Sequence, residues 1–139
     1  MKVTGLNGNE YSWNPHIDVR SGGFKSQYHI LAKSLLEELF PFDNIYEEVS
    51  LPGTSISDGK TLVADFCIPS QKLIVEVHGE QHYAYTPYYH KSKLGFMKCS
   101  ERGRDKIRWC NLNGITIIIL KYNEEIDEWR RQIIRRQDT

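Results

Sequence analysis

The sequence has 139 residues, and its 18 Lys and Arg residues balance 18 Asp and Glu residues to give a formal net charge of zero. With 40% hydrophobic and 26% charged residues, the composition fits one soluble globular domain and excludes a disordered or collagen-like chain. The zero net charge argues against a protein that coats nucleic acid by bulk charge. Three cysteines, Cys67, Cys99 and Cys110, have no CxxC spacing, which predicts a reducing compartment. Since we find no membrane span or signal peptide, we expect a cytoplasmic protein.

The first expected element is a hairpin of two short strands. Residues 3–6 and 10–13 flank Asn7-Gly8, a pair that is typical of a two-residue turn because both positions need a positive φ. The next expected elements are a helix from the N-cap Ser26 to Pro41, strands over 45–50, 61–68 and 72–78, a basic helix over about 91–112, a strand over 115–120, and a last helix that Asn123 caps.

Apolar spacing assigns the buried faces of the helices. In the first helix the expected stripe is formed by Tyr28, Leu31, Leu35 and Leu39, with Ala32, Leu36 and Phe40 beside it. Trp109 and Trp129 have apolar neighbours and are expected in the core. The order ββ-α-β-ββ-α-β-α predicts an α/β fold in which helices flank a mixed sheet. We expect a single domain, with the hairpin and a loop over residues 1–24 and a core over 25–136.

Two neighbouring strands carry acidic residues among apolar ones. Alternation places Val63, Asp65 and Cys67 on one face of their strand, and it places Glu76 and His78 together on the next. If the two strands pair as a hairpin, Asp65 lies across from the Glu76 end of its partner.

Two carboxylates are a typical protein contribution to a Mg²⁺ site, because Mg²⁺ prefers oxygen and keeps several waters or phosphate oxygens. His82 adds a further polar group just after the second strand. The plain alternative is a surface pair of carboxylates beside a half-buried histidine. For any one of these residues, the surface alternative is the better interpretation. For the converging set, the metal site is the better interpretation.

The spacing Asp65-(ten residues)-Glu76-x-His78 resembles the core of PD-(D/E)XK nucleases. A closer resemblance is to very-short-patch-repair endonucleases and to phage homing endonucleases of the same fold. It lies in the order of short motifs across residues 25–135: Leu51-Pro52-Gly53, Asp65-Phe66, His78-Gly79, Arg104-Asp105 and Asn113-Gly114. The resemblance implies a restriction-endonuclease-like sheet and a metal-dependent DNA endonuclease.

The resemblance also implies roles for individual residues. Asp65, Glu76 and the backbone carbonyl of Val77 would bind Mg²⁺, with Mn²⁺ expected to substitute. His78 would act as the general base or orient the water, since histidine ordinarily titrates near neutral pH. His29 and His82 would contact the phosphate or assist the leaving group.

Three positions depart from the family pattern. His29 stands where the family usually has a helix glutamate, His78 stands where many PD-(D/E)XK nucleases have lysine, and Val77 replaces the threonine of the repair enzymes. Zinc-type ligand spacing, which the repair enzymes have, is also not evident.

Charge is segregated along the chain. Residues 91–108 contain seven Lys or Arg against Glu101 and Asp105, whereas residues 37–48 contain five acidic residues and no basic ones. A basic helix beside a metal site is suited to phosphate contact. The residues expected to contact double-stranded DNA are Lys91, Lys93, Arg102, Arg104 and Lys106, with Tyr85, Tyr88 and Tyr89 of a tyrosine-rich loop, whose rings would stack on bases or enter a groove.

Several functions remain open on the sequence. The leading expectation is a site-specific endonuclease of the free-standing phage homing type, and the nearest alternative is a mismatch-nicking repair enzyme. A homodimer would favour double-strand cleavage and a monomer would favour nicking. A third possibility is a binding module that has the same fold and no longer cuts.

Overall fold

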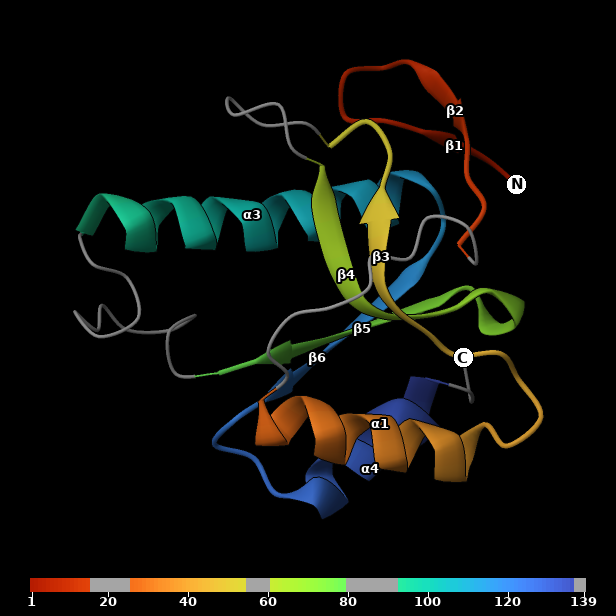
Figure 1. The fold of residues 1–139 in the computed structure, drawn as a ribbon, viewed down its shortest axis with the longest axis vertical. Coiled ribbons are helices and arrows are strands. Elements are labelled where there is room, and N and C mark those ends of the chain that lie inside the picture. The colour runs from red at the N-terminus through yellow and green to blue at the C-terminus, as the bar shows by residue number, and fades with distance from the viewer. Residues whose placement is uncertain (16–25, 55–60, 80–92, 137–139) are drawn as a thin grey trace.

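A four-stranded mixed sheet lies between two helical layers (Figure 1). The computed structural model describes residues 1–15, 26–54, 61–79 and 93–136, and for residues 93–100 it describes the backbone only. The strand order is β3-β4-β5-β6. β3, β4 and β5 are antiparallel neighbours, whereas β5 and β6 are parallel and α3 connects them. Helix α3 covers one face, and α1 and α4 cover the other (Figure 1).

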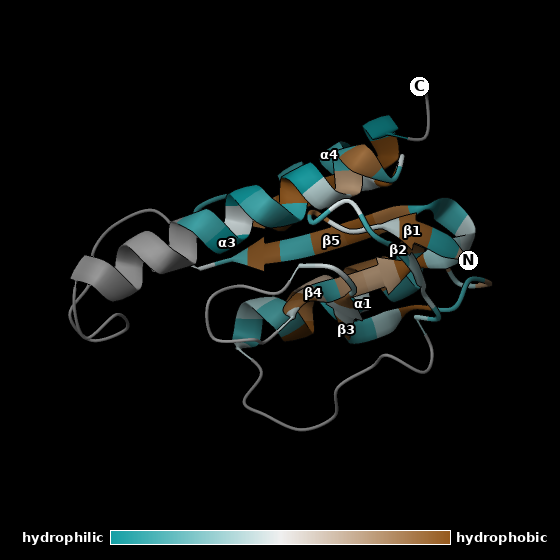
Figure 2. Ribbon diagram, turned by 90° about the horizontal axis from the view of Figure 1, so that it is seen from above, coloured by the Kyte–Doolittle hydropathy of each residue, from teal (hydrophilic) through white to brown (hydrophobic). Residues whose placement is uncertain are grey.

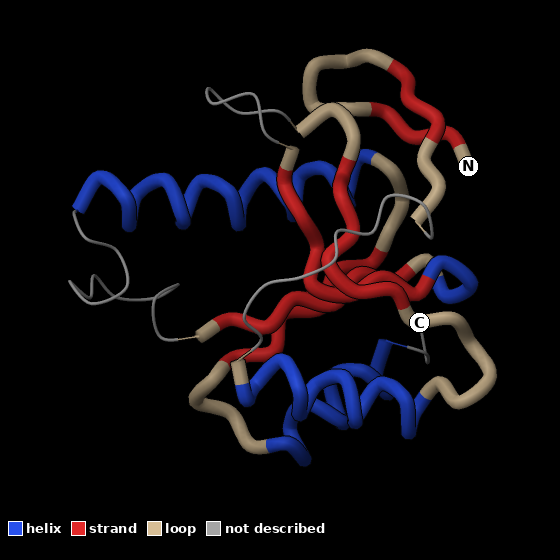
Figure 3. The backbone as a smooth tube through the Cα atoms, in the orientation of Figure 1, coloured by secondary structure: helices blue, strands red, loops and turns tan. Residues whose placement is uncertain are grey.

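The bounds of the elements are as follows (Figure 3): β1 Lys2–Thr4, β2 Glu10–Ser12, α1 Gln27–Leu39, β3 Tyr46–Leu51, β4 Leu62–Ile68, the short 3₁₀ helix η1 Pro69–Gln71, β5 Leu73–His78, α3 Lys93–Leu112, β6 Thr116–Lys121 and α4 Ile126–Arg136. The predicted element order, the α/β class and the N-terminal hairpin are confirmed.

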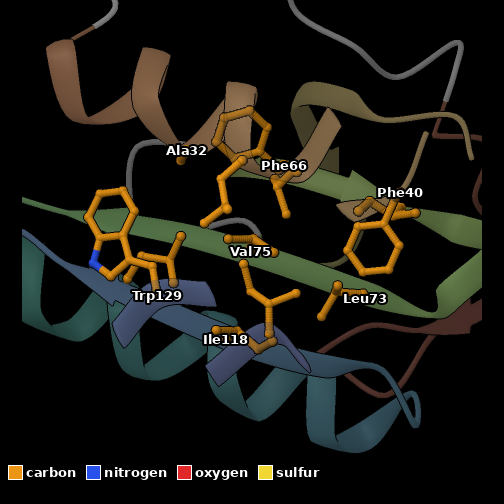
Figure 4. Packing of buried hydrophobic residues seen from close by; sticks show 12 residues of the cluster. Ala32, Phe40, Phe66, Leu73, Val75, Ile118 and Trp129 are labelled. Atoms are coloured by element: carbon orange, nitrogen blue, oxygen red, sulfur yellow. The ribbon is translucent and has the colours of Figure 1, made fainter. Parts of the chain in front are cut away.

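The face covered by α1 and α4 is packed with apolar side chains. Phe66, Val75 and Ile118 project from three neighbouring strands and meet Ala32 of α1 and Trp129 of α4 (Figure 4). Each of these residues is less than a tenth exposed. Burial of this apolar area is the main stabilising contribution on this side of the sheet.

The α3 face has its own core, and the N-terminal hairpin helps to build it. Val3 and Trp13 of this segment pack with Leu51 of β3 and with Trp109 and Cys110 of α3. The rings of Trp13 and Trp109 meet edge to face at 5.1 Å between centroids. Hydrophobic residues are concentrated on the strands between the helices, whereas α3 is largely hydrophilic (Figure 2).

The hairpin backbone is held in place by the Asn113 side chain after α3 and by a close approach to Gly53 after β3. Asn113, just after α3, accepts a hydrogen bond from Thr4 N (2.7 Å) and donates one to Thr4 O (2.9 Å). Gly53 has a φ of 78°, and a Cβ there would lie 2.4 Å from Gly5 Cα. The glycine of the Leu51-Pro52-Gly53 motif is therefore required by the docked hairpin.

Three local predictions are wrong in detail. β1 and β2 pair Thr4 with Glu10, so the hairpin has a longer loop than the predicted two-residue turn, and of Asn7 and Gly8 only Gly8 has a positive φ. In α1 the predicted stripe is wrong at Leu31, which is 47% exposed, whereas Leu35 and the expected neighbours Ala32 and Leu36 are buried. The buried α1 residues are His29, Ala32, Leu35 and Leu36.

At the start of α4, Asn123 is not the cap. The helix begins at Ile126, and Asp127 and Glu128 are the acidic residues of its first turn. Glu124 and Glu125, expected in the first turn, therefore precede the helix, whereas Arg135 and Arg136 lie in its last turn as expected, a charge order that suits the helix dipole.

Alternation along β4 breaks at Asp65, against the prediction. A regular strand places residues 64 and 66 on the same face. Here Phe66 packs on the α1 side, whereas Ala64 and Cys67 both pack on the α3 side. The predicted common face for Val63, Asp65 and Cys67 therefore does not form, since the strand rotates at the carboxylate.

β3 rotates at the same step. Glu47 contacts His29 of α1, whereas Val49 belongs to the α3-side core. Glu48 lies between them with a φ of 53°. A left-handed conformation costs roughly 1–2 kcal/mol in a residue other than glycine. Because the neighbours on both sides are paired in register, Glu48 stands opposite Asp65.

Candidate metal and phosphate site

The candidate site lies where β4 and β5 separate (Figure 1). Their backbone pairing extends from Ile68 and Leu73 to Phe66 and Val75. At the next residues, hydrogen bonds to the two carboxylates replace the pairing between the backbones. Asp65 N donates to Glu76 Oε2 (2.8 Å), and Val77 N donates to Asp65 Oδ2 (2.8 Å). The predicted meeting of the two acidic residues is confirmed, and each carboxylate satisfies an amide of the opposite strand.

Lys106 of α3 is the third member of this cluster. Its Nζ lies 2.5 Å from Glu76 Oε1, and its side chain is 17% exposed, while Glu76 as a residue is only 1% exposed. Oε1 is buried and accepts no hydrogen bond from any other described residue, so the Lys106 ammonium is its partner among the described residues. A buried carboxylate needs such a partner, because an unpaired charge away from water is costly.

The two carboxyl groups titrate in opposite directions. Burial and the negative charge of Glu76 raise the pKa of Asp65 well above its usual value. Burial alone would raise the pKa of Glu76 too, but the Lys106 ammonium and the hydrogen bonds from Asp65 and Lys106 outweigh it, and the pKa is lowered. Of the two groups, Asp65 therefore takes up a proton more readily than an ordinary aspartate, whereas Glu76 keeps its charge more readily beside Lys106.

The backbone of β5 fits the predicted metal role of Val77. Tyr122 N donates to His78 O (2.9 Å), so the His78 peptide groups face β6. Since successive residues of a strand point their peptide groups to opposite edges, the carbonyl of Val77 faces the gap beside Asp65. His78 itself is partly exposed at the end of β5, two residues beyond Glu76.

His29 lies on the other side of the sheet from Lys106. Its backbone N–H is capped by Ser26 Oγ, its ring stacks on Phe66 at 4.4 Å between centroids, and its Nε2 lies 2.9 Å from Glu47 Oε1. Lys33 Nζ lies 3.2 Å from the other oxygen of Glu47. The described contacts therefore tie His29 to Glu47, and its role at a phosphate stays a prediction.

The predicted DNA-binding residues fall into three groups. Arg102 and Arg104 are exposed on α3, as a phosphate contact requires. Lys106 is instead directed at the carboxylates. The side chain of Lys93 lies outside the described residues, as do the whole of His82, Tyr85, Tyr88, Tyr89 and Lys91.

Sequence reasoning placed Lys106 on a phosphate-binding face and missed its contact with Glu76. The sequence contains one indication of this contact. Lys106 precedes Trp109 by three residues and Cys110 by four, so it lies on the face of α3 that packs on the sheet. The sequence shows Glu47 only as one of the acidic residues over 37–48 and gives no indication that it contacts His29.

The residues at the fork suit Mg²⁺ chemically. Asp65, Glu76 and the Val77 carbonyl are all oxygen donors, and the buried Oε1 of Glu76 has no described partner besides the Lys106 ammonium. A Mg²⁺ ion can bind Glu76 Oε1 only after the Lys106 ammonium has moved away from it. Among the described residues, no group of three or more His, Cys, Asp and Glu side chains forms a metal-binding cluster, so water or phosphate oxygens would complete the coordination.

Two viral proteins are similar to this chain. One is the uncharacterized protein 307L of Invertebrate iridescent virus 6, 40% identical over 72 residues, which are 51% of this chain and 36% of that protein. The other is the uncharacterized protein 033L of Invertebrate iridescent virus 3, 33% identical over 70 residues, which are 50% of this chain and 36% of that protein. The chain thus spans about a third of the length of the relatives it matches.

No protein-family model matches the sequence, and no solved structure gives a significant match. Within the described residues, no helix has both the length and the apolar character to cross a membrane. What the chain does is therefore inferred from the arrangement of its own side chains.

Proposed function

We propose that this chain is a Mg²⁺-dependent endonuclease that hydrolyses phosphodiester bonds in double-stranded DNA. The observation that carries the proposal is the meeting of Asp65 and Glu76 at the separation of two strands, with a lysine directed at them from a helix. Energetically this is an expensive arrangement, since it interrupts a strand pairing and buries charge. Perturbed carboxyl pairs of this kind concentrate at functional sites.

Each residue at the fork has a task in this proposal. Asp65, Glu76 and the Val77 carbonyl would hold Mg²⁺, which when bound would activate a water and neutralise charge on the scissile phosphate. His78, partly exposed on the same strand, would accept the proton of the attacking water or orient that water. The exposed Arg102, one turn before Lys106, would contact a DNA phosphate beside the fork, and the exposed Arg104 would contact DNA elsewhere along α3.

The finer class remains part of the proposal. A phage-type, site-specific homing endonuclease is our preferred form, and a mismatch-nicking repair enzyme is the alternative. Cleavage products on plasmid DNA distinguish them, because a homing enzyme linearises a plasmid at one site whereas a repair enzyme nicks only a mismatched duplex.

The test of the proposal is cleavage of supercoiled plasmids of diverse sequence with Mg²⁺ or Mn²⁺. Replacing Asp65 by alanine (Asp65→Ala) should reduce cleavage by about a thousandfold or more, since bound metal contributes several kcal/mol to such transition states. DNA binding, measured by fluorescence anisotropy, should be retained.

Asp43→Ala is the matched control, because Asp43 accepts hydrogen bonds from Ser70 and Gln71, away from the fork. It should cleave as the wild type does. Mg²⁺-dependent cleavage that survives Asp65→Ala would contradict the assignment.

A binding module without nuclease activity is the second candidate. It is favoured by one observation, namely that Lys106 already neutralises Glu76 without a metal. A module of this kind would bind duplex DNA with equal affinity in Mg²⁺ and in a chelator, and it would cut none of the plasmids.

A further inference from the structure

Lys106 occupies the oxygen that a metal ion would need. Of the two oxygens of Glu76, Oε2 accepts the amide of Asp65, and Oε1 meets the Lys106 ammonium. A divalent cation at Oε1 and an ammonium at the same atom repel each other strongly in a buried site. Metal binding therefore requires the ammonium to leave, whereas Oε2 and its hydrogen bond can remain in place.

The ion pair is built in a way that permits this movement. No other described residue donates a hydrogen bond to Oε1, so the Lys106 ammonium is the one described group that a metal has to displace from this oxygen. The lysine side chain has a long flexible stem that can carry its charge toward water. Its side chain keeps 17% of its surface exposed, so a route to solvent exists on the resting protein.

The helix supplies a destination for the displaced charge. Arg102 lies one turn before Lys106 on α3 and is exposed. Residues four apart share one face of a helix, so an ammonium released from Glu76 joins Arg102 along the same side of α3. Together they would place two cationic groups next to the fork, where the proposed function requires a phosphate.

We propose that Lys106 is an internal cation that blocks the metal site at rest and, on displacement by a divalent metal, contacts DNA phosphate, so that metal binding and DNA binding strengthen each other. This inference rests on the proposed nuclease site. Coupling between two ligands is reciprocal, so each must raise the affinity of the other by the same factor.

The experiment compares the wild type with Lys106→Met and Lys33→Met. Lys33 is the matched control, since it also pairs with a glutamate, on the opposite side of the sheet. Two quantities are measured for each protein: Mn²⁺ affinity without DNA by calorimetry, and affinity for a mixed-sequence duplex by anisotropy with Ca²⁺ or with a chelator. Gel electrophoresis confirms that the duplex stays intact.

For the wild type and for Lys33→Met, Ca²⁺ should raise duplex affinity about tenfold, within the usual range of coupled sites. For Lys106→Met this factor should fall below about threefold, and Mn²⁺ alone should bind about tenfold more tightly, because the competing ammonium is gone. Circular dichroism verifies that each variant is folded.

Two outcomes would overturn the inference while leaving the nuclease proposal intact. Weaker Mn²⁺ binding by Lys106→Met would mean that the lysine supports the metal. Unchanged coupling in that variant would mean that its charge does not reach DNA. If the wild type binds no Mn²⁺ at all, the proposed nuclease function itself fails, and the inference fails with it.

Discussion

Two lysine–glutamate pairs lie on opposite sides of the same sheet and differ in their surroundings. Lys106 and Glu76, on the α3 side, have side-chain exposures of 17% and 2%, and their charged atoms are 2.5 Å apart. Lys33 and Glu47, on the α1 side, have exposures of 48% and 20% at 3.2 Å. Beside the buried pair, burial and the charge of Glu76 raise the pKa of Asp65, and Lys106 opposes that rise, whereas water screens the exposed pair.

The comparison shows that a lysine–glutamate pair can have a different role when it is buried than when it is exposed. An exposed pair contributes little to stability and can be removed at small cost. A buried pair costs about as much to desolvate as its attraction returns. Its presence between a strand and a helix is therefore better explained by what it does at the fork than by the stability it gives.

Breaking the buried pair should have the largest effect on stability. We expect Lys106→Met, in the presence of a chelator at pH 7, to lower the free energy of unfolding by about 3 kcal/mol, since it leaves Glu76 buried and unpaired. Urea denaturation measures the change.

The pH dependence of that loss identifies its cause. The pKa of Glu76 is depressed in the folded protein, so its stabilising contribution is present above its unfolded pKa and disappears as the pH falls through the folded value. The deficit of Lys106→Met should therefore shrink in acid. The double variant Lys106→Met with Glu76→Gln should regain part of the stability, and a deficit that is the same with and without Glu76 would show that lost packing is the cause.

A smaller effect, in the opposite direction, is expected from Asp65→Asn. An asparagine can accept the hydrogen bond from Val77 N as Asp65 does, and it places no negative charge beside Glu76. Without metal at pH 8, we expect this variant to be more stable than the wild type by about 0.5–2 kcal/mol, the usual gain when a destabilised functional position is relieved.

The sign follows from the raised pKa of Asp65. A carboxyl group with a raised folded-state pKa stabilises the fold below its unfolded pKa, and this contribution is lost as the pH rises through the folded value. Thermal unfolding from pH 4 to pH 8 should show that decline in the wild type and not in Asp65→Asn. If the stability of the two proteins changed with pH in the same way, the raised pKa of Asp65 would be contradicted as the cause.

The smallest effect is expected at the exposed pair. Lys33→Met should change the free energy of unfolding by no more than about 0.5 kcal/mol, and 0.5 M NaCl should remove most of that difference by screening. Salt titration of urea unfolding provides the measurement. A loss comparable to that of Lys106→Met would end the contrast between the two sides of the sheet.

The sequence predicted the elements because their signals are local. Alternation, caps and turn residues place α1, the strands and α3 within a few residues, and Ser26 caps α1 as expected. The spacing of Asp65 and Glu76 on adjacent strands also predicted their meeting, because a short connection such as Pro69–Gln71 leaves the two strands paired.

What the sequence did not reveal depends on contacts between distant segments. The rotation of β4 at Asp65 requires Glu48 of another strand to rotate with it, and nothing near Asp65 encodes that. Likewise, Lys106 lies 30 positions beyond Glu76, and seven basic residues in its segment make it look like one more surface charge. Only the packing of α3 distinguishes it.

The side chain of Asn113 has a consequence for how the chain assembles. The hairpin itself needs only residues close in sequence, but its attachment joins Thr4 to a residue 109 positions away. Closing a loop of that length carries a large entropic cost before the contact is gained. During synthesis the first thirteen residues can form their turn early, yet they find their docking surface only after α3 has been made. Docking of the first strands is thus expected among the last steps of folding.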